Sequence, residues 1–377
     1  MRNHFDSIII GAGVIGSSIA YNLAKKGRTV LVLEKNRVAS KASSAAAGML
    51  GAQTELEQDS PLFQLAKESR RLFPDLALEL KSLTGIDVEL HHNGMLKIAR
   101  SVEEASEFQR LIDQQQKLGE DASWIDPIEL HQKEPFTNKG LHGAMHIPND
   151  GNLSAPHLSN AFAAGARATG AIIKEYTEVT ELIEEGNRII GVETHAETYH
   201  ANNVIVAGGA WSNRLLKGAG IELKTYPVKG ECFSVVTEEP LITSTLFTKG
   251  CYIVPKTGGR LIIGATEKAH SFDQKVTLNG LSKLMDRATQ IIPELADSEW
   301  DNAWAGIRPQ TNDGLPYLGE HPDMKGLFVA TGHYRNGILL SPITGKLMAD
   351  LVEGIPLKSD WAEAFHLNRD QIGVDQL

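Results

Sequence analysis

Three short apolar runs along the chain each end at a glycine-rich turn. They cover residues 5–10, 204–207 and 327–330, and helical periodicity follows the first over 14–26 and the last over 341–351. Short, mainly apolar runs of this length are typical of strands that are buried on both faces of a parallel sheet. The pattern therefore predicts parallel strands that alternate with helices at the start, middle and end of the chain.

The segments between these runs have shorter strands and tight turns. Thr257-Gly258-Gly259 predicts a hairpin that joins two of these strands, and Asn93-Gly94 predicts another between residues 88–91 and 95–99. Antiparallel strands are expected over 230–236, 252–255 and 261–264. Helices are expected over 60–83, which Ser60-Pro61 begins and Gly85 ends, and over 101–118, 156–169 and 278–291.

Segments of parallel strands and helices thus alternate with segments of antiparallel strands. This alternation predicts an α/β chain, α+β overall, with two domains that are discontinuous in sequence. A Rossmann-like domain is expected to comprise residues 1–84, 146–219 and 306–377. An inserted domain built on an antiparallel sheet is expected to comprise residues 85–145 and 220–305.

Composition and charge narrow the class of protein. The 377 residues carry a net charge of −10, which argues against nucleic acid or an anionic membrane surface as a partner. The only cysteines are Cys232 and Cys251, whose spacing matches no metal motif, so no metal site is expected. Because the chain shows neither a signal peptide nor a long apolar segment, we expect a cytoplasmic protein.

The strongest motif is a dinucleotide-binding loop. Gly11, Gly13 and Gly16 form a G-x-G-x-x-G sequence between the first strand and the first helix, and Glu34 ends the next apolar run. The first glycine permits a tight turn, the second lets a pyrophosphate approach the backbone, and the third lets helix and strand pack closely. A carboxylate at Glu34 can accept hydrogen bonds from ribose hydroxyls. The motif itself leaves FAD and NAD both open.

Several ordered segments resemble the flavoprotein amine oxidases of glutathione-reductase type, the D-amino acid oxidase and sarcosine oxidase family that also includes glycine oxidases. These segments are 43–52, 227–232, 251–255, 304–309 and 335–340. The resemblance implies a Rossmann-like FAD-binding domain and FAD that is bound non-covalently, because no cysteine follows Cys251. By resemblance the residues that line FAD, besides the three glycines and Glu34, are Val14, Ile15, Lys35, Ala42, Ser43, Ala47, Gly48, Met49, Val179, His333, Tyr334, Arg335, Asn336, Gly337, Ile338 and Leu339.

The resemblance also assigns a substrate site. An arginine in a G-x-R-P turn can be structural, but the family match makes Arg308 the residue that holds a substrate carboxylate. Tyr252 becomes a second donor to that carboxylate, and the backbone carbonyl of Arg335 becomes a partner of the substrate amine. Met49 is expected to line the substrate pocket. Glu267 stands close after Gly264-Ala265-Thr266, where the family's glycine-oxidising members have a methionine, which would place a negative charge near the substrate side chain.

The activity implied is oxidative deamination of glycine and other small amines, such as sarcosine and small D-amino acids. Hydride passes from Cα to the flavin, and the products are an oxoacid, ammonia and hydrogen peroxide. A sarcosine oxidase, a D-amino acid oxidase or dehydrogenase, and a non-catalytic FAD-binding subunit are the alternatives. By resemblance we expect a homotetramer that takes the substrate and O2 and supplies thiazole synthesis for thiamine.

Overall fold

The computed structural model describes residues 4–369, and in this part of the chain an eight-stranded sheet forms the first layer. Its strand order is β18-β19-β11-β1-β2-β8, and β10 and β9 extend from β11. The strands are β1 (His4–Ile10), β2 (Val30–Leu33), β8 (Ile172–Lys174), β9 (Val179–Glu185), β10 (Arg188–Thr194), β11 (Thr198–Val206), β18 (Tyr317–Glu320) and β19 (Leu327–Thr331).

The three apolar runs lie side by side at the centre of this sheet. β1 runs parallel to both β2 and β11, and β11 runs parallel to β19. The carboxyl ends of β1, β11 and β19 therefore meet at one edge, which is where ligands bind in sheets of this type. The predicted βαβ unit is confirmed, with helix α1 (Val14–Lys25) between β1 and β2.

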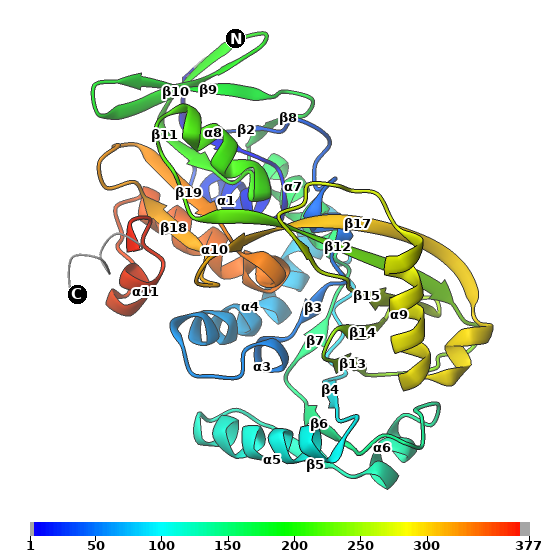
Figure 1. Ribbon diagram of the computed structural model, residues 1–377. Helices are drawn as coiled ribbons and strands as arrows, with labels where there is room; N and C mark the ends of the chain where they lie inside the picture. The colour runs from blue at the N-terminus through cyan, green and yellow to red at the C-terminus, as the bar shows by residue number, and fades with distance from the viewer. Residues whose placement is uncertain (1–3, 370–377) are drawn as a thin grey trace.

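Four helices pack together on one face of the sheet (Figure 1). They are α1, α4 (Pro61–Thr84), α7 (Ala155–Ala168) and α10 (Gly337–Val352). The predicted ends of α4 are confirmed: the Ser60 hydroxyl accepts a hydrogen bond from the amide of Phe63 (3.1 Å), and Gly85 ends the helix with φ +74°. Phe162, Leu23 and Leu340 are fully buried between these helices and the sheet.

The second layer is a nine-stranded sheet of order β16-β12-β15-β14-β13-β4-β6-β5, with β17 beside β12. It is antiparallel except where β13 pairs with β4. The strands are β4 (Met95–Ile98), β5 (Ser123–Ile125), β6 (Ala144–Ile147), β12 (Thr225–Val236), β13 (Thr245–Thr248), β14 (Cys251–Pro255), β15 (Arg260–Gly264), β16 (Lys268–Ala269) and β17 (Glu299–Thr311).

Two helices cover this sheet. α9 (Leu278–Ile291), with the 3₁₀ turn η2 (Pro293–Asp297), packs on β12, β14 and β15, and α5 (Val102–Lys117) packs on β5 and β6. The hairpin predicted through residues 257–259 is confirmed as β14–β15. The hairpin predicted at Asn93-Gly94 is wrong: β4 pairs with β6 and β13, and His91 bridges Asn152 instead.

The long antiparallel pair β12–β17 crosses the middle of the molecule (Figure 1). Its register runs from the pair Thr225–Thr311 to the pair Val236–Glu299. β17 spans the expected domain boundary at 305/306, and β6 spans the one at 145/146. Only part of β12 and none of β17 was expected as a strand.

The remaining elements are short. They are α2 (Ala42–Ala45), β3 (Met49–Leu50), α3 (Ala52–Glu55), α6 (Pro127–Lys133), β7 (Gly151–Asn152), η1 (Gly209–Trp211), α8 (Ser212–Gly218), η3 (Tyr334–Asn336) and α11 (Ser359–Ala364). Within residues 4–369, no helix is both long and apolar enough to cross a bilayer.

Candidate functional site

The glycine loop after β1 has the backbone geometry that its motif predicts. Gly11 has φ +103°, and a Cβ there would lie 2.7 Å from the carbonyl oxygen of Ala207, the residue directly after β11. A Cβ on Gly16 would overlap the carbonyl oxygen of Gly11. Both obstacles are backbone atoms, so neither position tolerates a side chain, and the loop packs closely against β11 and the first turn of α1.

Glu34 and Ser43 converge on this loop from two other segments. The Glu34 carboxylate accepts hydrogen bonds from the amides of Ala12 and Asn36 (2.8 Å each). The Ser43 hydroxyl, on α2, accepts one from the amide of Val14 (2.9 Å) at the N-terminus of α1. A hydroxyl at a helix N-terminus marks the position where a phosphate oxygen could be bound.

Lys35 and Val179 lie farther along the same edge. The ammonium of Lys35 pairs with Glu178 (2.7 Å) on the surface. Val179 begins β9, two residues after Thr177, whose amide donates to the carbonyl of Glu34 (2.7 Å). Both residues therefore lie beside Glu34, where an adenosine could reach them.

The segment from Ala47 to Met49 joins the two layers. Gly48 has φ +80°, and a Cβ there would overlap the carbonyl oxygen of Leu153. Met49 follows on β3, which pairs with β7 through Asn152. Ala47 is buried in the same apolar cluster as Tyr252, and Met49 packs against that cluster. This segment thus lies between the dinucleotide loop and the second sheet.

Residues His333 to Leu339 form η3 and the first turn of α10, directly after β19. His333 is buried, and its Nε2 lies 3.1 Å from the Thr344 hydroxyl. Burial lowers the pKa of His333 to about 3, so its ring is neutral. The His333 ring therefore stabilises the turn between β19 and α10.

These observations test whether the chain fits FAD. Turns after β1, β11 and β19 meet at one edge, and the Thr331 hydroxyl donates to the carbonyl of Gly209 (3.0 Å) to join the last two. Gly11 and Gly16 permit the tight, closely packed turn that brings the loop backbone to this edge, and Glu34 and Ser43 supply polar groups beside it. The residues present therefore fit an extended dinucleotide such as FAD.

Arg308 lies on β17 with its side chain over the neighbouring strand β12. A Cβ added to Gly230 would lie 2.5 Å from both terminal nitrogens of its guanidinium. One of these nitrogens also lies 3.4 Å from the carbonyl oxygen of Thr266. The absence of a side chain at Gly230 is what lets the guanidinium lie flat against the sheet.

The side chain of Tyr252 likewise lies over a glycine of a neighbouring strand. It lies on β14 opposite Gly264 of β15, which in turn lies opposite Cys232 of β12. A Cβ on Gly264 would overlap the Tyr252 hydroxyl and lie 2.7 Å from the Cys232 sulfur. The tyrosine ring thus crosses over Gly264, and its hydroxyl oxygen lies 3.3 Å from Sγ of Cys232.

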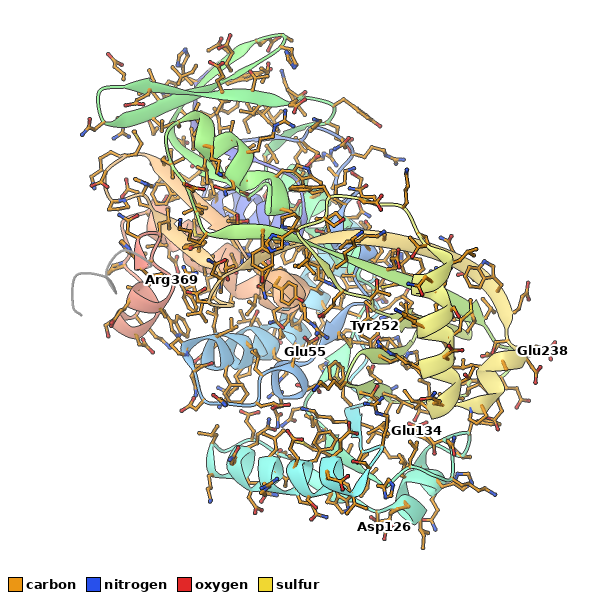
Figure 2. All side chains as sticks on the ribbon, in the orientation of Figure 1. Glu55, Asp126, Glu134, Glu238, Tyr252 and Arg369 are labelled. Atoms are coloured by element: carbon orange, nitrogen blue, oxygen red, sulfur yellow. The ribbon has the colours of Figure 1, made fainter. Side chains whose placement is uncertain are left out.

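The electrostatic surroundings keep the Tyr252 hydroxyl protonated. Burial raises the pKa of Tyr252 well above its ordinary value, although the positive charges of Arg308 and Arg335 oppose this shift. Tyr252 is buried among the strands of the second sheet (Figure 2). A protonated phenol beside a guanidinium can donate hydrogen bonds to a carboxylate, and the pair suits an anionic group.

Arg335 is held between two carboxylates. Its Nε lies 2.8 Å from Glu55 and one terminal nitrogen lies 3.0 Å from Glu267. Tyr334 has φ +46°; burial raises its pKa, and so does the neighbouring carboxylate of Glu267, to which its hydroxyl donates a hydrogen bond. Glu267 therefore reaches the cluster of charged groups that contains Arg335, although its side chain is 49% exposed.

Glu55 comes from α3, which a buried carboxylate holds in place. Asp150 accepts hydrogen bonds from the amide (2.9 Å) and hydroxyl (2.8 Å) of Thr54, and it pairs with Arg70 of α4. Burial raises the pKa of Asp150, and the positive charge of Arg70 opposes that shift. Sequence reasoning missed Glu55, Cys232 and the role of Gly230, because each matters only through contacts between strands or helices that are distant in the chain.

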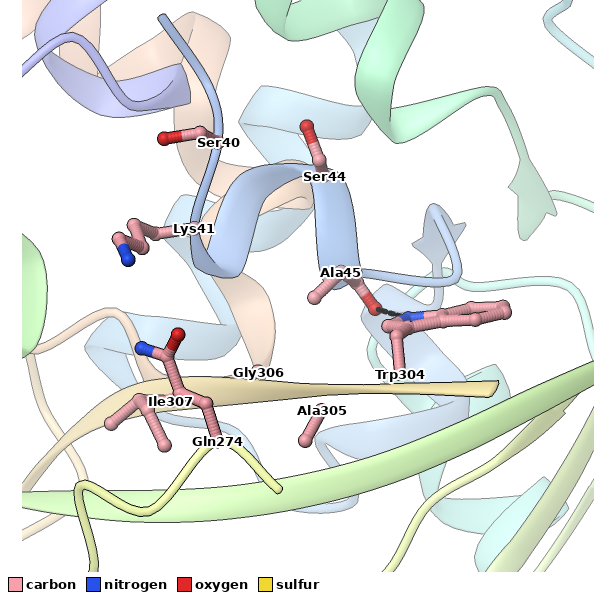
Figure 3. Close-up of a pocket in the computed structure, with 9 residues that line it drawn as sticks. All are labelled: Ser40, Lys41, Ser44, Ala45, Gln274, Trp304, Ala305, Gly306 and Ile307. Carbon is pink, nitrogen blue, oxygen red and sulfur yellow. Dashed lines mark hydrogen bonds between the residues drawn. The ribbon is translucent and has the colours of Figure 1, made fainter. Parts of the chain in front are cut away.

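A pocket of about 190 Å³ lies between α2 and β17 (Figure 3). Trp304 closes one side of it by donating a hydrogen bond from Nε1 to the carbonyl of Ala45 (2.9 Å). Gly306 lies directly against α2, since a Cβ there would lie 2.7 Å from Cβ of Ala45. Two of its lining residues, Lys41 and Ser44, flank Ala42 and Ser43 in the chain. Neither Arg308 nor Tyr252 lines the pocket.

A dinucleotide cradle on a Rossmann-type sheet, joined to an antiparallel sheet that carries the Arg308–Tyr252 pair, defines a dinucleotide-dependent oxidoreductase. Residues 6–351 match the family of FAD dependent oxidoreductases called DAO, and the chain belongs to that family. The expected fold class, enzyme class and dependence on FAD are thereby confirmed.

Individual relatives are similar over the whole chain. The glycine oxidase of Geobacillus kaustophilus is 47% identical over 379 residues, which cover 100% of both chains. Its crystal structure superimposes with a TM-score of 0.95 and covers 98% of this chain and 99% of that one. The bifunctional protein ThiO/ThiG of Trichormus variabilis is 35% identical over 97% of this chain and 55% of its own length. The L-proline dehydrogenase of P. horikoshii has a TM-score of 0.90 at 26% identity, with 99% of each chain covered.

Proposed function

We propose that this protein is a glycine oxidase, which converts glycine, O2 and water into glyoxylate, ammonia and hydrogen peroxide. The observation that carries the proposal is the arrangement of Arg308 and Tyr252, whose donor groups lie flat over Gly230 and Gly264. These donors suit the carboxylate of a small amino acid. The family and the full-length similarity to the glycine oxidase of Geobacillus kaustophilus support the same substrate.

Arg308 and Tyr252 bind and orient the substrate in this proposal. The guanidinium pairs with one carboxylate oxygen or both, and the Tyr252 hydroxyl donates to the same group. Fixing the carboxylate fixes the direction of the Cα–H bond, which is the main contribution that positioning makes to rate. FAD, when bound, supplies the acceptor for the hydride that leaves Cα and passes the electrons to O2.

Arg335, Glu55 and Glu267 set the charge at the other side of the substrate. Because both carboxylates already pair with the Arg335 side chain, the guanidinium is not free to bind a substrate anion. The backbone carbonyl of Arg335 remains the proposed acceptor for the substrate amine. Glu267 adds a negative charge that favours neutral or cationic substrate side chains over anionic ones.

We propose that the lining residues expected from the sequence hold FAD without a covalent bond. Both cysteines lie on strands of the second sheet, Cys232 beside Tyr252 and Cys251 within the buried core. Acid precipitation should therefore release all the yellow colour into the supernatant. Colour that stays with the precipitate would overturn this part of the proposal. A homotetramer, a cytoplasmic location and a role in thiazole synthesis likewise stay predictions.

Anaerobic mixing of the yellow protein with glycine tests the proposed function. Bleaching of the flavin, followed by glyoxylate and peroxide once air enters, is the expected result. Bleaching by sarcosine or a D-amino acid but not by glycine would keep the reaction and change the substrate. Bleaching without peroxide in air would favour a dehydrogenase, the second candidate, which the fold of the L-proline dehydrogenase supports. No bleaching by any small amine would favour a non-catalytic FAD-binding subunit.

A further inference from the structure

The Tyr252 hydroxyl has one neighbour that the proposed function does not use, the thiol of Cys232. The two residues lie two strands apart, on β14 and β12, with Gly264 of β15 between them. Because Gly264 has no side chain, the tyrosine ring spans the middle strand, and its oxygen reaches within 3.3 Å of Sγ. Cys232 is 3% exposed and Tyr252 6%, so water does not compete for this contact.

The hydrogen bond between these groups can run in either direction, but only one direction suits substrate binding. A phenol carries a single proton and can donate only one hydrogen bond. If Tyr252 donated to the sulfur, its oxygen would face the substrate carboxylate without a proton and repel it. If the thiol donates to the phenol oxygen, the phenol proton is free to point at the carboxylate.

Both groups keep their protons in this environment. Burial raises the pKa of the Cys232 thiol and that of the Tyr252 phenol, so neither is ionised near neutral pH. The hydrogen bond with Tyr252 and the charge of Arg308 lower the pKa of Cys232, and the charges of Arg308 and Arg335 lower that of Tyr252, but burial outweighs them in both groups. A neutral thiol is a weak donor with no other polar partner among the side-chain contacts of the described residues.

We propose that Cys232 is a positioning residue, whose thiol donates a hydrogen bond to the Tyr252 oxygen and so directs the phenol proton toward the substrate carboxylate. The proposal rests on the proposed function, because it requires that Tyr252 donates to that carboxylate. Cys232 itself touches neither substrate nor cofactor in this scheme. It acts only through Tyr252, which makes its effect conditional on the tyrosine hydroxyl.

The competing explanation is that Cys232 merely fills space, as buried cysteines often do. Cys251 provides a matched control, because it is also a buried cysteine (2% exposed) and is the residue next to Tyr252 on β14. Its sulfur does not contact the tyrosine hydroxyl; its only side-chain bond among the described residues is a 3.9 Å contact with the Tyr252 carbonyl. Removing either thiol therefore creates a cavity of similar chemistry, but only Cys232→Ala removes the donor.

The experiment measures KM and kcat for glycine. It also measures the dissociation constant of glycolate, which has the carboxylate of glycine but a hydroxyl in place of the amine, from the change that glycolate causes in the flavin spectrum. The variants are Cys232→Ala, Cys232→Ser, Cys251→Ala, Tyr252→Phe and the double variant Cys232→Ala/Tyr252→Phe. We expect Cys232→Ala to raise KM and the glycolate dissociation constant roughly three- to tenfold, the effect of one lost hydrogen bond, with a smaller change in kcat. Cys232→Ser, which keeps a donor, should restore both values to within about twofold. Cys251→Ala should leave both unchanged.

The double variant decides between positioning and filling. In the Tyr252→Phe background, Cys232→Ala should have no further effect on KM, because the hydroxyl it directs is absent. An equal factor in both backgrounds, or equal effects of Cys232→Ala and Cys251→Ala, would overturn the proposal. If Tyr252→Phe itself leaves KM unchanged, the role of Tyr252 in the proposed function fails and this inference fails with it. If Cys232→Ala loses FAD, Cys232→Val, which fills the space without a donor, replaces it: KM should still rise in Cys232→Val and not in Cys232→Ser, and equal KM values in these two variants would overturn the proposal.

Discussion

The guanidinium of Arg308 lies against Gly230 so closely that a Cβ on this glycine would lie 2.5 Å from both terminal nitrogens. Gly230 and Cys232 lie on the same face of β12, since side chains alternate along a strand, and Gly264 lies opposite Cys232 on that face. The two glycines therefore form one floor, over which an arginine from β17 and a tyrosine from β14 bring their donor groups together.

A methyl group added to this floor should weaken substrate binding. In Gly264→Ala the new Cβ would occupy the space of the Tyr252 hydroxyl, so the ring must move away from the carboxylate site. We expect KM for glycine to rise about tenfold or more, with a loss of about 1–3 kcal/mol in the free energy of unfolding from overpacking. Steady-state kinetics and urea unfolding measure the two effects.

Gly218→Ala is the control for this substitution. Gly218 ends α8, and a Cβ there has open space around it within 4 Å. This variant should keep wild-type KM and stability. A Gly264→Ala protein with the same KM as Gly218→Ala would show that the position of Tyr252 does not matter for substrate.

Loss of the guanidinium should affect the enzyme more severely. Arg308→Ala removes the charged partner of the substrate carboxylate, which leaves that carboxylate buried and unpaired at a penalty of about 3–5 kcal/mol. This corresponds to a fall of roughly 10²–10³-fold or more in kcat/KM for glycine. Arg308→Lys should recover only part of the loss, since a lysine cannot form the bidentate pair. A fall of less than tenfold in Arg308→Ala would contradict the assignment.

The charge of Glu267 should set the preference between neutral and acidic substrates. Glu267→Gln removes a carboxylate whose side chain is half exposed, so the effect is screened and modest. We expect the ratio of kcat/KM for D-aspartate to that for D-alanine to rise about two- to fivefold. The rise should shrink when the salt concentration is increased. Glu238→Gln is the control, because Glu238 lies at the periphery (Figure 2); an equal change in both variants would rule out a local effect.

Local signals in the sequence predicted much of the first layer and a helix of the second. The ends of α4 follow from Ser60, Pro61 and Gly85, and the helix expected over 278–291 matches α9 residue for residue. The glycine loop could be found because its function requires residue types at fixed spacing. In such cases the determinants of structure lie within a few residues of one another.

The parts that sequence reasoning missed depend on distant segments. The outer half of β17 is exposed and mostly polar, as at Glu299 and Asp301, so it lacks the apolar face of a buried strand and is held by its pairing with β12. Asn93-Gly94 has the residues of a hairpin turn, but β4 finds its partners in β6 and β13. Likewise, the contact between Cys232 and Tyr252 exists only because β15 places a glycine between them.

The neutral His333 should make stability depend on pH in the acidic range. Burial lowers the pKa of this ring to about 3, whereas an unfolded histidine titrates near about 6.5. Below about pH 6.5 the unfolded chain therefore binds a proton that the folded chain does not, and stability falls by about 1.4 kcal/mol per pH unit from this group until the pH approaches 3. Above about pH 6.5 the ring is neutral in both the folded and the unfolded chain, so His333 no longer makes the free energy of unfolding depend on pH.

Urea unfolding of wild type and His333→Gln at pH 7.5 and pH 5 isolates this effect. A glutamine can keep a hydrogen bond to Thr344 but does not titrate. Between the two pH values the wild type should lose about 2 kcal/mol more of its free energy of unfolding than the variant does. His195→Gln, at an exposed position, should lose as much as the wild type. Equal losses in wild type and His333→Gln would mean that the folded protein protonates His333 or opens around it at pH 5.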